Sequence, residues 1–368
     1  MIFIQSEASN KKSFSSVPIF FLIYLLLIQF LLVYIIPTDS IYDYRLNYDL
    51  VKDRPSNIDA VMKKIKKAIV SEGLEDYIVI LGDSVAYSSP GPANTSIGYY
   101  MNILADKEGN RLKVFNLSMP SMQVGDIYTM LLKMNQYGIS NENVIINVLY
   151  AGFVDRTPYP PPVFWMDYQL KKLDKETYIK SYLPHSVKKK SKFQALKEDV
   201  SNWLYSNVSI LMYKDYIKEH IKNFVADIRR VSSAPEVIAP WYEKPFLKEL
   251  LAEAQYQQGF SSKPFNMTVD NPQVDFLNKI FQLQKGKNTL YFLAAVNEAL
   301  VEDFIVKDKY YENITLIDNY FQENNQHYVN FYNRIPYELF SDQVHLTSKG
   351  YEFLANELWL EISKWNTN

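Results

Sequence analysis

The stretch YIVILGDSVAYSS, from Tyr77 to Ser89, decides the fold. Its first five residues, Tyr77 to Leu81, are apolar or aromatic, which predicts a short buried strand. Gly82 follows and allows the backbone to turn sharply. Ser84 then lies just beyond the carboxyl end of the strand, at the edge where open α/β sheets bind their ligands. A serine in this place is either a nucleophile or a residue that forms a turn or caps a helix.

The segments around this stretch alternate between strand-like and helix-like patterns. Further strands are predicted at Lys113–Leu117, Asn143–Leu149, Thr289–Val296 and Ile314–Ile317. The spacing of apolar residues predicts helices over 58–69, 97–105, 127–134 and 351–365. Ser56 or Asn57 is expected to cap the first helix, and Gly73 to end it. This alternation predicts a three-layer α/β/α domain with a parallel sheet between two layers of helices.

The chain after the third predicted strand breaks this pattern. Arg156–Trp165 reads RTPYPPPVFW, and proline, which lacks a backbone donor, excludes regular structure there. Residues 166–260 are charged and compatible with helices, without a strand pattern. We therefore expect one domain over residues 56–368 that contains a helical insertion at 166–260.

The N-terminal region predicts attachment to a membrane. Val17–Ile36 holds twenty residues without a charge, and a helix of that length spans roughly 30 Å, the thickness of a bilayer core. Lys11 and Lys12 precede it, so the positive-inside rule places residues 1–16 in the cytoplasm and the rest outside. This predicts a single-pass protein of the cell membrane, with a linker over residues 37–55. A cleaved signal peptide is the competing interpretation, although no small-residue cleavage site follows the run.

Composition excludes several classes of site. The chain has no cysteine, which excludes disulfides, thiol catalysis and cysteine-bound metal. Its formal net charge of -2 gives no indication of nucleic-acid binding. The four histidines are His185, His220, His327 and His345, and they lack the spacing of metal ligands. We therefore expect neither a metal nor another cofactor, and a catalytic histidine must be one of these four.

A second polar motif, SDQVHLTSKG, begins at Ser341. Asp342 and His345 are three residues apart, a spacing that places both side chains on the same side of a turn. Asp342 can then accept a hydrogen bond from one ring nitrogen of His345, and the other nitrogen can act as a base toward Ser84. Thr347 is expected to cap the final helix. The alternative is that the Asp-His pair only forms a polar helix cap.

The GDS motif after the first strand and the Asp-x-x-His motif before the last helix together resemble the SGNH, or GDSL-like, hydrolase family. The resemblance extends from about residue 75 to the end of the chain, apart from the insertion. It implies that Ser84 is the nucleophile, that His345 is its general base, and that Asp342 completes the triad. It also implies an oxyanion hole to which the Ser84 N–H contributes.

The second motif of that family usually ends a strand with Asn and continues to a glycine whose N–H binds the oxyanion. Asn116 matches the Asn, and Ser121 stands at the glycine position. A backbone N–H survives this change, although serine turns less freely than glycine. Ser121 is therefore a second oxyanion-hole candidate.

The third family motif is usually Gly-x-Asn, with the Asn side chain as a further donor. Gly152 matches the glycine and is a third oxyanion-hole candidate, but Val154 stands where the Asn is expected. Valine cannot donate, and losing one such donor slows a reaction by about 10²–10³. Asn147 or Asn297 would have to be recruited by folding to replace it.

An N-terminal anchor, an extracytoplasmic Ser-Asp-His domain and an inserted helical region resemble the envelope-modifying members of this superfamily. That resemblance implies a membrane-anchored serine acyl esterase or O-acyltransferase that acts on an ester of a cell-envelope polymer, such as an acylated polysaccharide. It also implies a multispanning acyl-transfer protein as a partner. The alternative is a catalytically degenerate domain of the same fold that binds glycan or scaffolds an envelope-modification complex.

Overall fold

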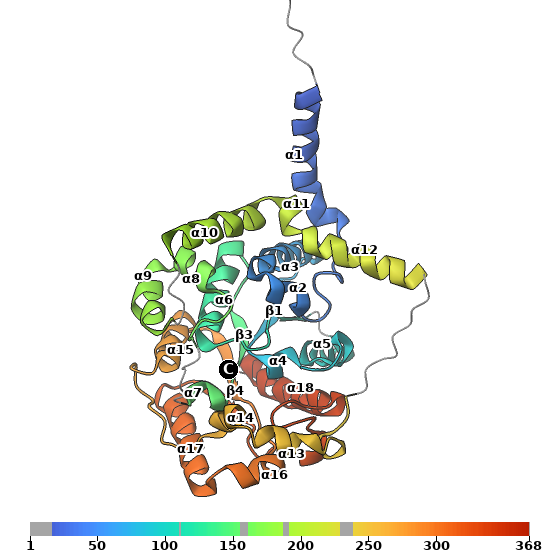
Figure 1. Ribbon diagram of the computed structural model, residues 1–368. Helices are drawn as coiled ribbons and strands as arrows, with labels where there is room; N and C mark the ends of the chain where they lie inside the picture. The colour runs from blue at the N-terminus through green and yellow to red at the C-terminus, as the bar shows by residue number, and fades with distance from the viewer. Residues whose placement is uncertain (1–16, 110–111, 155–160, 187–190, 229–237, 368) are drawn as a thin grey trace, which may run out of the picture.

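The computed structural model describes residues 17–109, 112–154, 161–186, 191–228 and 238–367 (Figure 1). Within these residues the strands are β1 (Tyr77–Leu81), β2 (Lys113–Asn116), β3 (Asn143–Val148), β4 (Asn288–Leu293) and β5 (His327–Asn330). The helices before the insertion are α1 (Val17–Ile35), α2 (Tyr48–Asp53), α3 (Ile58–Glu72), α4 (Ser84–Tyr87), α5 (Ile97–Lys107), α6 (Val124–Tyr137) and α7 (Tyr150–Phe153). The later helices are α8 (Asp167–Leu173), α9 (Lys175–Thr177), α10 (Lys192–Asn207), α11 (Ser209–Met212), α12 (Lys214–Ile228), α13 (Phe246–Leu251), α14 (Ala254–Gln257), α15 (Pro272–Leu283), α16 (Glu298–Val301), α17 (Lys307–Glu323) and α18 (Ser348–Ile362).

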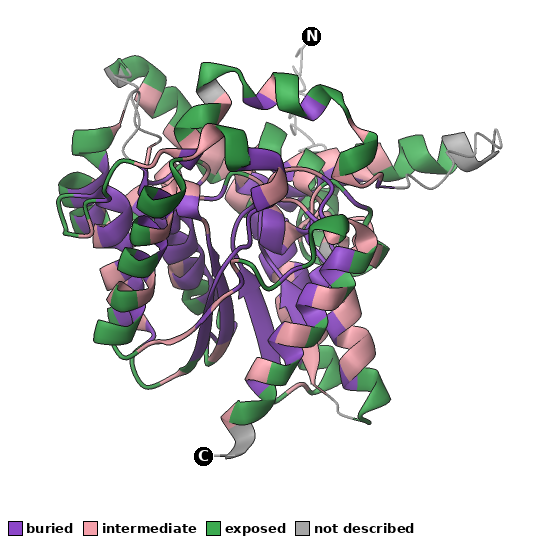
Figure 2. Ribbon diagram, turned by 90° about the horizontal axis from the view of Figure 1, so that it is seen from below, coloured by how far each residue is buried: buried purple, intermediate pink, exposed green. Residues whose placement is uncertain are grey.

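The strands form one parallel sheet in the order β2-β1-β3-β4-β5. Successive side chains of a strand point to opposite faces, and β1 shows this directly. Val79 and Leu81 pack into a hydrophobic core with residues of α3, α6, α15 and α17, whereas Ile78 and Ile80 pack on the other face with α5 and α18. Figure 2 shows the buried strands between helices on both sides. This arrangement confirms the predicted three-layer α/β/α architecture.

The predicted helix ends are largely confirmed. α3 ends at Gly73, whose φ of 62° lies in the left-handed region that favours glycine. Thr347 caps α18, because its hydroxyl oxygen accepts a hydrogen bond from the Gly350 N–H at 3.2 Å. Asn57 immediately precedes α3 but does not cap it with its side chain, which instead donates to the Leu50 carbonyl.

One predicted strand is wrong. Ile314–Ile317 lies within α17, because its apolar residues belong to a longer helical pattern. The buried positions of this helix recur every three or four residues, and include Tyr310, Ile314, Ile317 and Phe321. The last strand is instead β5, His327–Asn330, which sequence analysis missed because this edge strand is short and mostly half-exposed.

The segment 37–55, predicted as a linker, packs against the domain. Ile41, Leu46 and Val51 are buried in the core. The buried Arg45 side chain donates hydrogen bonds to three backbone carbonyls of residues 87–91, at the end of α4 and just after it. This segment therefore supports the turn that follows β1.

The predicted insertion at 166–260 is helical. In its described parts it comprises α8 to α14 and contains no strand. Residues 161–165, the described part of the Pro-rich segment, form neither helix nor strand, as the prolines predict.

The apolar N-terminal run forms α1, which projects from the domain in Figure 1. Across the residues that the structure describes, we find no helix with the combined length and apolar character needed to cross a membrane. The transmembrane assignment of residues 17–36 therefore stays a prediction. Residues 1–16, predicted to be cytoplasmic, lie outside the described residues.

A buried ion pair joins α3 to α6. Lys133 Nζ lies 2.6 Å from Asp59 Oδ1, and each side chain is only 4% exposed. Two hydroxyls also donate to the Asp59 carboxylate, from Tyr137 at 2.5 Å and from Ser206 of α10 at 2.6 Å. This cluster ties the insertion to the helical layer beneath it.

Replacing Lys133 with methionine is expected to lower the free energy of unfolding by about 3–5 kcal/mol, because it leaves the buried Asp59 carboxylate without its counter-charge. Equilibrium urea unfolding measures the change. The matched control is Lys113→Met, whose partner Glu72 is 44% exposed, and which should cost no more than about 1 kcal/mol. Equal losses in the free energy of unfolding for the two variants would contradict the burial of the Lys133–Asp59 ion pair.

Candidate active site

The turn after β1 places Ser84 at the carboxyl edge of the sheet. Ser84 is the first residue of the short helix α4 and is half-buried. Asp83 caps this helix, because its carboxylate accepts a hydrogen bond from the Val85 N–H at 2.9 Å. The cap fixes the backbone on both sides of Ser84.

Gly82 is required at this turn by lack of space. A Cβ atom at this position would lie 2.5 Å from the Asn147 Cβ and 2.8 Å from the Ala86 Cβ. The ends of β1 and β3 therefore approach each other as closely as a glycine allows, which sets where α4 begins.

The loop before α18 positions Asp342 and His345. One carboxylate oxygen of Asp342, Oδ1, accepts hydrogen bonds from the N–H groups of Val344 and His345 at 2.9 and 2.8 Å. The other oxygen, Oδ2, lies 2.7 Å from His345 Nδ1. The i, i+3 spacing thus brings the two side chains together, as the sequence predicts.

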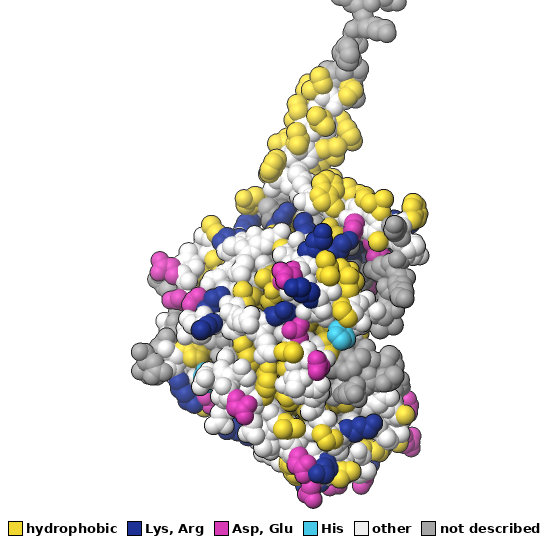
Figure 3. Space-filling model, turned by 90° about the vertical axis from the view of Figure 1, so that its left-hand side faces the viewer, with side chains coloured by type: hydrophobic (Ala, Val, Ile, Leu, Met, Phe, Trp, Pro, Cys, Tyr) yellow, Lys and Arg dark blue, Asp and Glu magenta, His cyan; other side chains and the backbone are white. Residues whose placement is uncertain are grey.

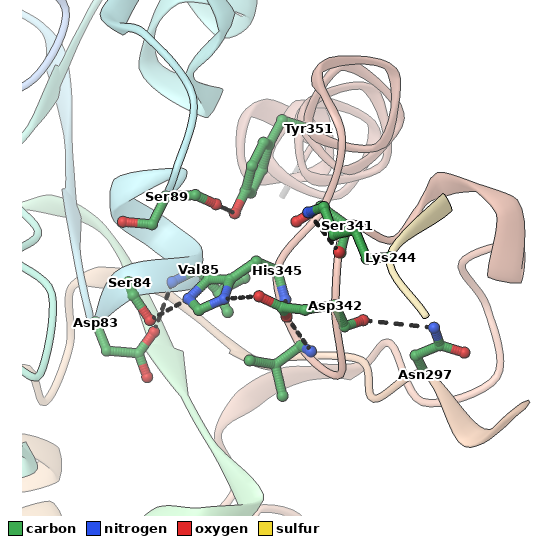
Figure 4. Close-up of polar contacts among 11 residues, drawn as sticks. Asp83, Ser84, Val85, Ser89, Lys244, Asn297, Ser341, Asp342, His345 and Tyr351 are labelled. Carbon is green, nitrogen blue, oxygen red and sulfur yellow. Dashed lines mark hydrogen bonds and ion pairs between the residues drawn. The ribbon is translucent and has the colours of Figure 1, made fainter. Parts of the chain in front are cut away.

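The structure also brings this pair to Ser84. His345 Nε2 lies 2.8 Å from Ser84 Oγ, and Figure 4 shows the three side chains in line. A carboxylate can only accept, so Nδ1 carries the proton toward Asp342, and Nε2 of the neutral ring accepts from the Ser84 hydroxyl. This is the geometry in which a serine is activated as a nucleophile.

The charges around His345 favour its protonated form. Burial lowers the pKa of His345, but the hydrogen bond and charge of Asp342, with the charge of Asp83, outweigh it, so its pKa lies above 6.5. Burial raises the pKa of Asp342, and the bond to His345 reverses this to a net lowering. Burial raises the pKa of Asp83 to about 7. The site is therefore arranged to stabilise an imidazolium.

Several residues that sequence analysis did not find hold the loop and the turn in place. The Lys244 ammonium donates to the Ser341 carbonyl at 2.9 Å, and Tyr351 donates to the Ser89 carbonyl at 2.5 Å. Arg45 supports the segment after α4, as described above. They act on backbone atoms from distant segments and carry no local motif, so no sequence signal could have identified them.

Ser84 and Ser121 stay predictions as oxyanion-hole donors. The Ser84 N–H lies in the first turn of α4, where helical N–H groups have no partner within the helix. Ser121 has a φ of 63°, in the left-handed region that favours glycine. The loop of Ser121 is held against the turn by a hydrogen bond from the Met119 N–H to the Gly82 carbonyl at 3.0 Å.

The third candidate, Gly152, does not serve in this way. Its N–H donates to the Leu149 carbonyl at 3.0 Å within α7, so the bond is already used. Val154, which stands where the Asn is expected, is buried in the hydrophobic core.

Each asparagine considered as a replacement uses its side-chain N–H₂ group in a local hydrogen bond. Asn147 lies against Gly82 and donates to the Val148 carbonyl at 3.1 Å. Asn297 donates to the Asp342 carbonyl at 3.4 Å, and so supports the loop of the pair (Figure 4).

Two of the remaining histidines contact residues outside this cluster. His220 Nδ1 lies 3.2 Å from the Ser40 hydroxyl, and His327 Nδ1 accepts from the Trp365 indole. Within the described part of the chain, no group of three or more His, Asp or Glu side chains is placed to hold a metal ion.

No protein-family model and no curated protein matches the chain. Among solved structures, it is similar to the lipase/acylhydrolase from Enterococcus faecalis, with a TM-score of 0.36 and 11% identity over 78% of this chain and 95% of that chain. It is also similar to a member of the lipolytic protein G-D-S-L family from Veillonella parvula, with a TM-score of 0.35 and 10% identity over 78% and 96%. The esterase EstA from Pseudoalteromonas has a TM-score of 0.35 and 10% identity over 80% and 100%. Because these identities and TM-scores are low, the fold and the site are assigned from the geometry described above.

Replacing Gly82 with alanine is expected to destabilise the protein by about 1–3 kcal/mol, because the added methyl group overpacks the contact with Asn147 and Ala86. Urea unfolding measures the loss. Gly152→Ala is the control, since a Cβ there would meet nothing within 4 Å, and its stability should be unchanged or slightly higher. If Gly82→Ala left the free energy of unfolding unchanged, the close contact of Gly82 with Asn147 and Ala86 would be contradicted.

Proposed function

We propose that the protein is a serine-dependent acyl esterase or O-acyltransferase. The observation that carries this proposal is the continuous chain from Ser84 Oγ to His345 Nε2 at 2.8 Å and from His345 Nδ1 to Asp342 at 2.7 Å. If Ser84 only capped a helix and His345 only lay at the surface, their side chains would have no reason to be in contact.

The proposed reaction begins when His345 takes the proton of Ser84 and the oxygen attacks the ester carbonyl carbon. The N–H groups of Ser84 and Ser121 bind the negatively charged oxygen that forms. His345 then gives the proton to the departing alcohol oxygen as the carbon–oxygen bond breaks, which leaves an acyl-Ser84 intermediate. Water or a sugar hydroxyl, deprotonated in turn by His345, attacks this ester and restores the free serine.

Hydrolysis and transfer differ only in the final acceptor, and both remain within the proposal. We propose an ester of a cell-envelope polymer, such as an acylated polysaccharide, as substrate. The domain would lie outside the cell membrane, with residues 1–16 in the cytoplasm and a multispanning acyl-transfer protein as partner. Support for this placement comes from the apolar side chains of α1 and from Lys11 and Lys12 before them.

A fluorophosphonate is expected to label the protein covalently at Ser84, because the activated hydroxyl attacks phosphorus as it would attack an ester. Ser84→Ala and His345→Ala should lose the label, whereas Ser89→Ala, a nearby serine whose contact uses its carbonyl, should keep it. Mass spectrometry of the labelled peptide identifies the site. A folded wild type that resists labelling while it binds glycan would instead favour the degenerate, glycan-binding alternative.

The rate of labelling is expected to fall at acidic pH, with an apparent pKa above 6.5. The base must be neutral, and the pKa of His345 is raised, so activity is present above this pKa and lost as pH falls through it. Asp342→Asn should move the acid limb to lower pH and slow labelling by roughly 10⁴. The control Asp106→Asn, at an exposed position of α5, should leave the profile unchanged, and identical profiles for all three proteins would exclude the proposed role of Asp342.

A further inference from the structure

The helix α10 of the insertion exposes an apolar stripe. Phe193, Leu196, Val200 and Trp203 follow a spacing of three and four residues, which places them on one face of the helix. All four are exposed, from 51% for Val200 to 77% for Phe193. Large apolar side chains gathered in this way on a surface mark an interaction site.

Two polar residues of α10 contact the rest of the protein. Asp199 forms an ion pair with Lys171 of α8 at 2.8 Å, and Ser206 donates to the buried Asp59 carboxylate. A helix at a water-exposed surface normally has its large apolar side chains inward. The two polar contacts instead hold α10 against the domain while its apolar stripe stays exposed.

The neighbouring helices continue this apolar surface. We define the collar as the exposed apolar side chains of α10, α11 and α12, which are Phe193, Leu196, Val200, Trp203, Ile210, Ile221, Phe224 and Val225. A hollow of about 410 Å³ lies beside α10, bounded by Val200 and Trp203 and by Tyr168, Lys171 and Lys172 of α8. Asp199 also lines the hollow and pairs with Lys171.

The collar lies beside the base of α1. In Figure 1, α10, α11 and α12 lie across one end of the domain, and α1 projects from that end. Figure 3 shows hydrophobic side chains gathered at this end, beside the base of α1, with Lys and Arg side chains below them.

The side chain and carbonyl of Gln29 hold α1 to the collar. The Gln29 amide donates to the Asn207 carbonyl at 2.5 Å and accepts from the Ser209 N–H at 2.7 Å. The Ser209 hydroxyl donates to the Gln29 carbonyl at 2.6 Å. Gln29 is the polar interruption in the apolar run, and these contacts satisfy its amide at the junction of α10 and α11.

We infer that the collar contacts the lipid of a bilayer and seats the domain on the membrane surface. The inference rests on the membrane attachment proposed for α1. Because Gln29 holds α1 and the collar together, the medium that covers the apolar side chains of α1 also reaches α10, α11 and α12. Helices that lie in the plane of the interface with their apolar faces toward the acyl chains bind membranes in this way.

The apolar surface of α1 continues past its contact with the collar. Leu32 packs against the hydrophobic core of the domain, whereas Phe30, Tyr34 and Ile35 are 65–70% exposed. Exposed apolar side chains of α1 and of the collar are therefore found at the same end of the domain.

Single cysteines test the inference, since the chain has none of its own. Leu196→Cys, in the collar, is compared with Leu360→Cys on α18, which lies away from α1 (Figure 1) and is similarly exposed, at 60% against 62%. Leu22→Cys reports on α1. Each full-length variant carries an environment-sensitive fluorophore and is reconstituted into phosphatidylcholine vesicles. Nitroxide lipids and aqueous iodide then measure contact with lipid and with water.

We expect nitroxide lipid to quench the labels at positions 196 and 22 several-fold more strongly than the label at position 360, and iodide to show the reverse order. If the label on α1 contacts lipid but iodide reaches the collar label, the inferred lipid contact of the collar is contradicted. The proposed membrane attachment of α1 is then unaffected. If iodide reaches both labels, the lipid contact of the collar and the membrane attachment of α1 are both contradicted. Protection of the collar label that disappears as the protein-to-lipid ratio is lowered would assign the surface to a second copy of the chain and overturn the inference. Fluorophosphonate labelling of the same samples tests the proposed hydrolase separately.

Discussion

The contact between Ser84 Oγ and His345 Nε2 joins residues that are 261 positions apart, and it depends on how α18 returns across the sheet. The strand before His345, β5, is at the edge of the sheet, with β4 and β3 between it and β1. α18 packs with α5 in the same hydrophobic core as Ile78 and Ile80 of β1. This packing brings the beginning of α18, and the loop that precedes it, back to the end of β1.

Close approach of backbones then sets the finer geometry of the site. Gly82 leaves no space for a side chain against Asn147, and the Ser121 loop is bonded to the Gly82 carbonyl through Met119. Ser121 itself holds a left-handed conformation that costs a non-glycine residue of order 1–3 kcal/mol. Such strain persists only where the surroundings fix the backbone, as they do beside this candidate oxyanion hole.

The structure also connects the site to the opposite end of the molecule. The segment 37–55 follows α1, packs into the core through Ile41 and Val51, and supports residues 87–91 through Arg45. On the other side, the insertion contributes Lys244, which holds the loop of His345, and α10, which carries the collar. The segment 37–55 therefore supports the turn of Ser84, and the insertion supports the loop of His345.

Much of this fold could be predicted because its signals are local. The apolar strand before Gly82, the glycine at the end of α3 and the spacing of Asp342 and His345 each depend on neighbouring residues, and the structure has them as predicted. Ile314–Ile317 shows the limit of local signals. A short β-branched run fits a strand and a helix equally well, and only its packing among the residues of α17 decided between them.

The sequence by itself determined the types of residue that can form a nucleophile, a base and its carboxylate partner, because chemistry depends on the side chains present. Only the tertiary structure decided which backbone groups surround them. Gly152 matches a motif, yet a local hydrogen bond occupies its N–H, whereas Ser121 departs from the motif and has a left-handed backbone conformation that favours glycine. The sequence specifies which side chains are present. The direction of a backbone N–H, in contrast, depends on how segments far apart along the chain pack together.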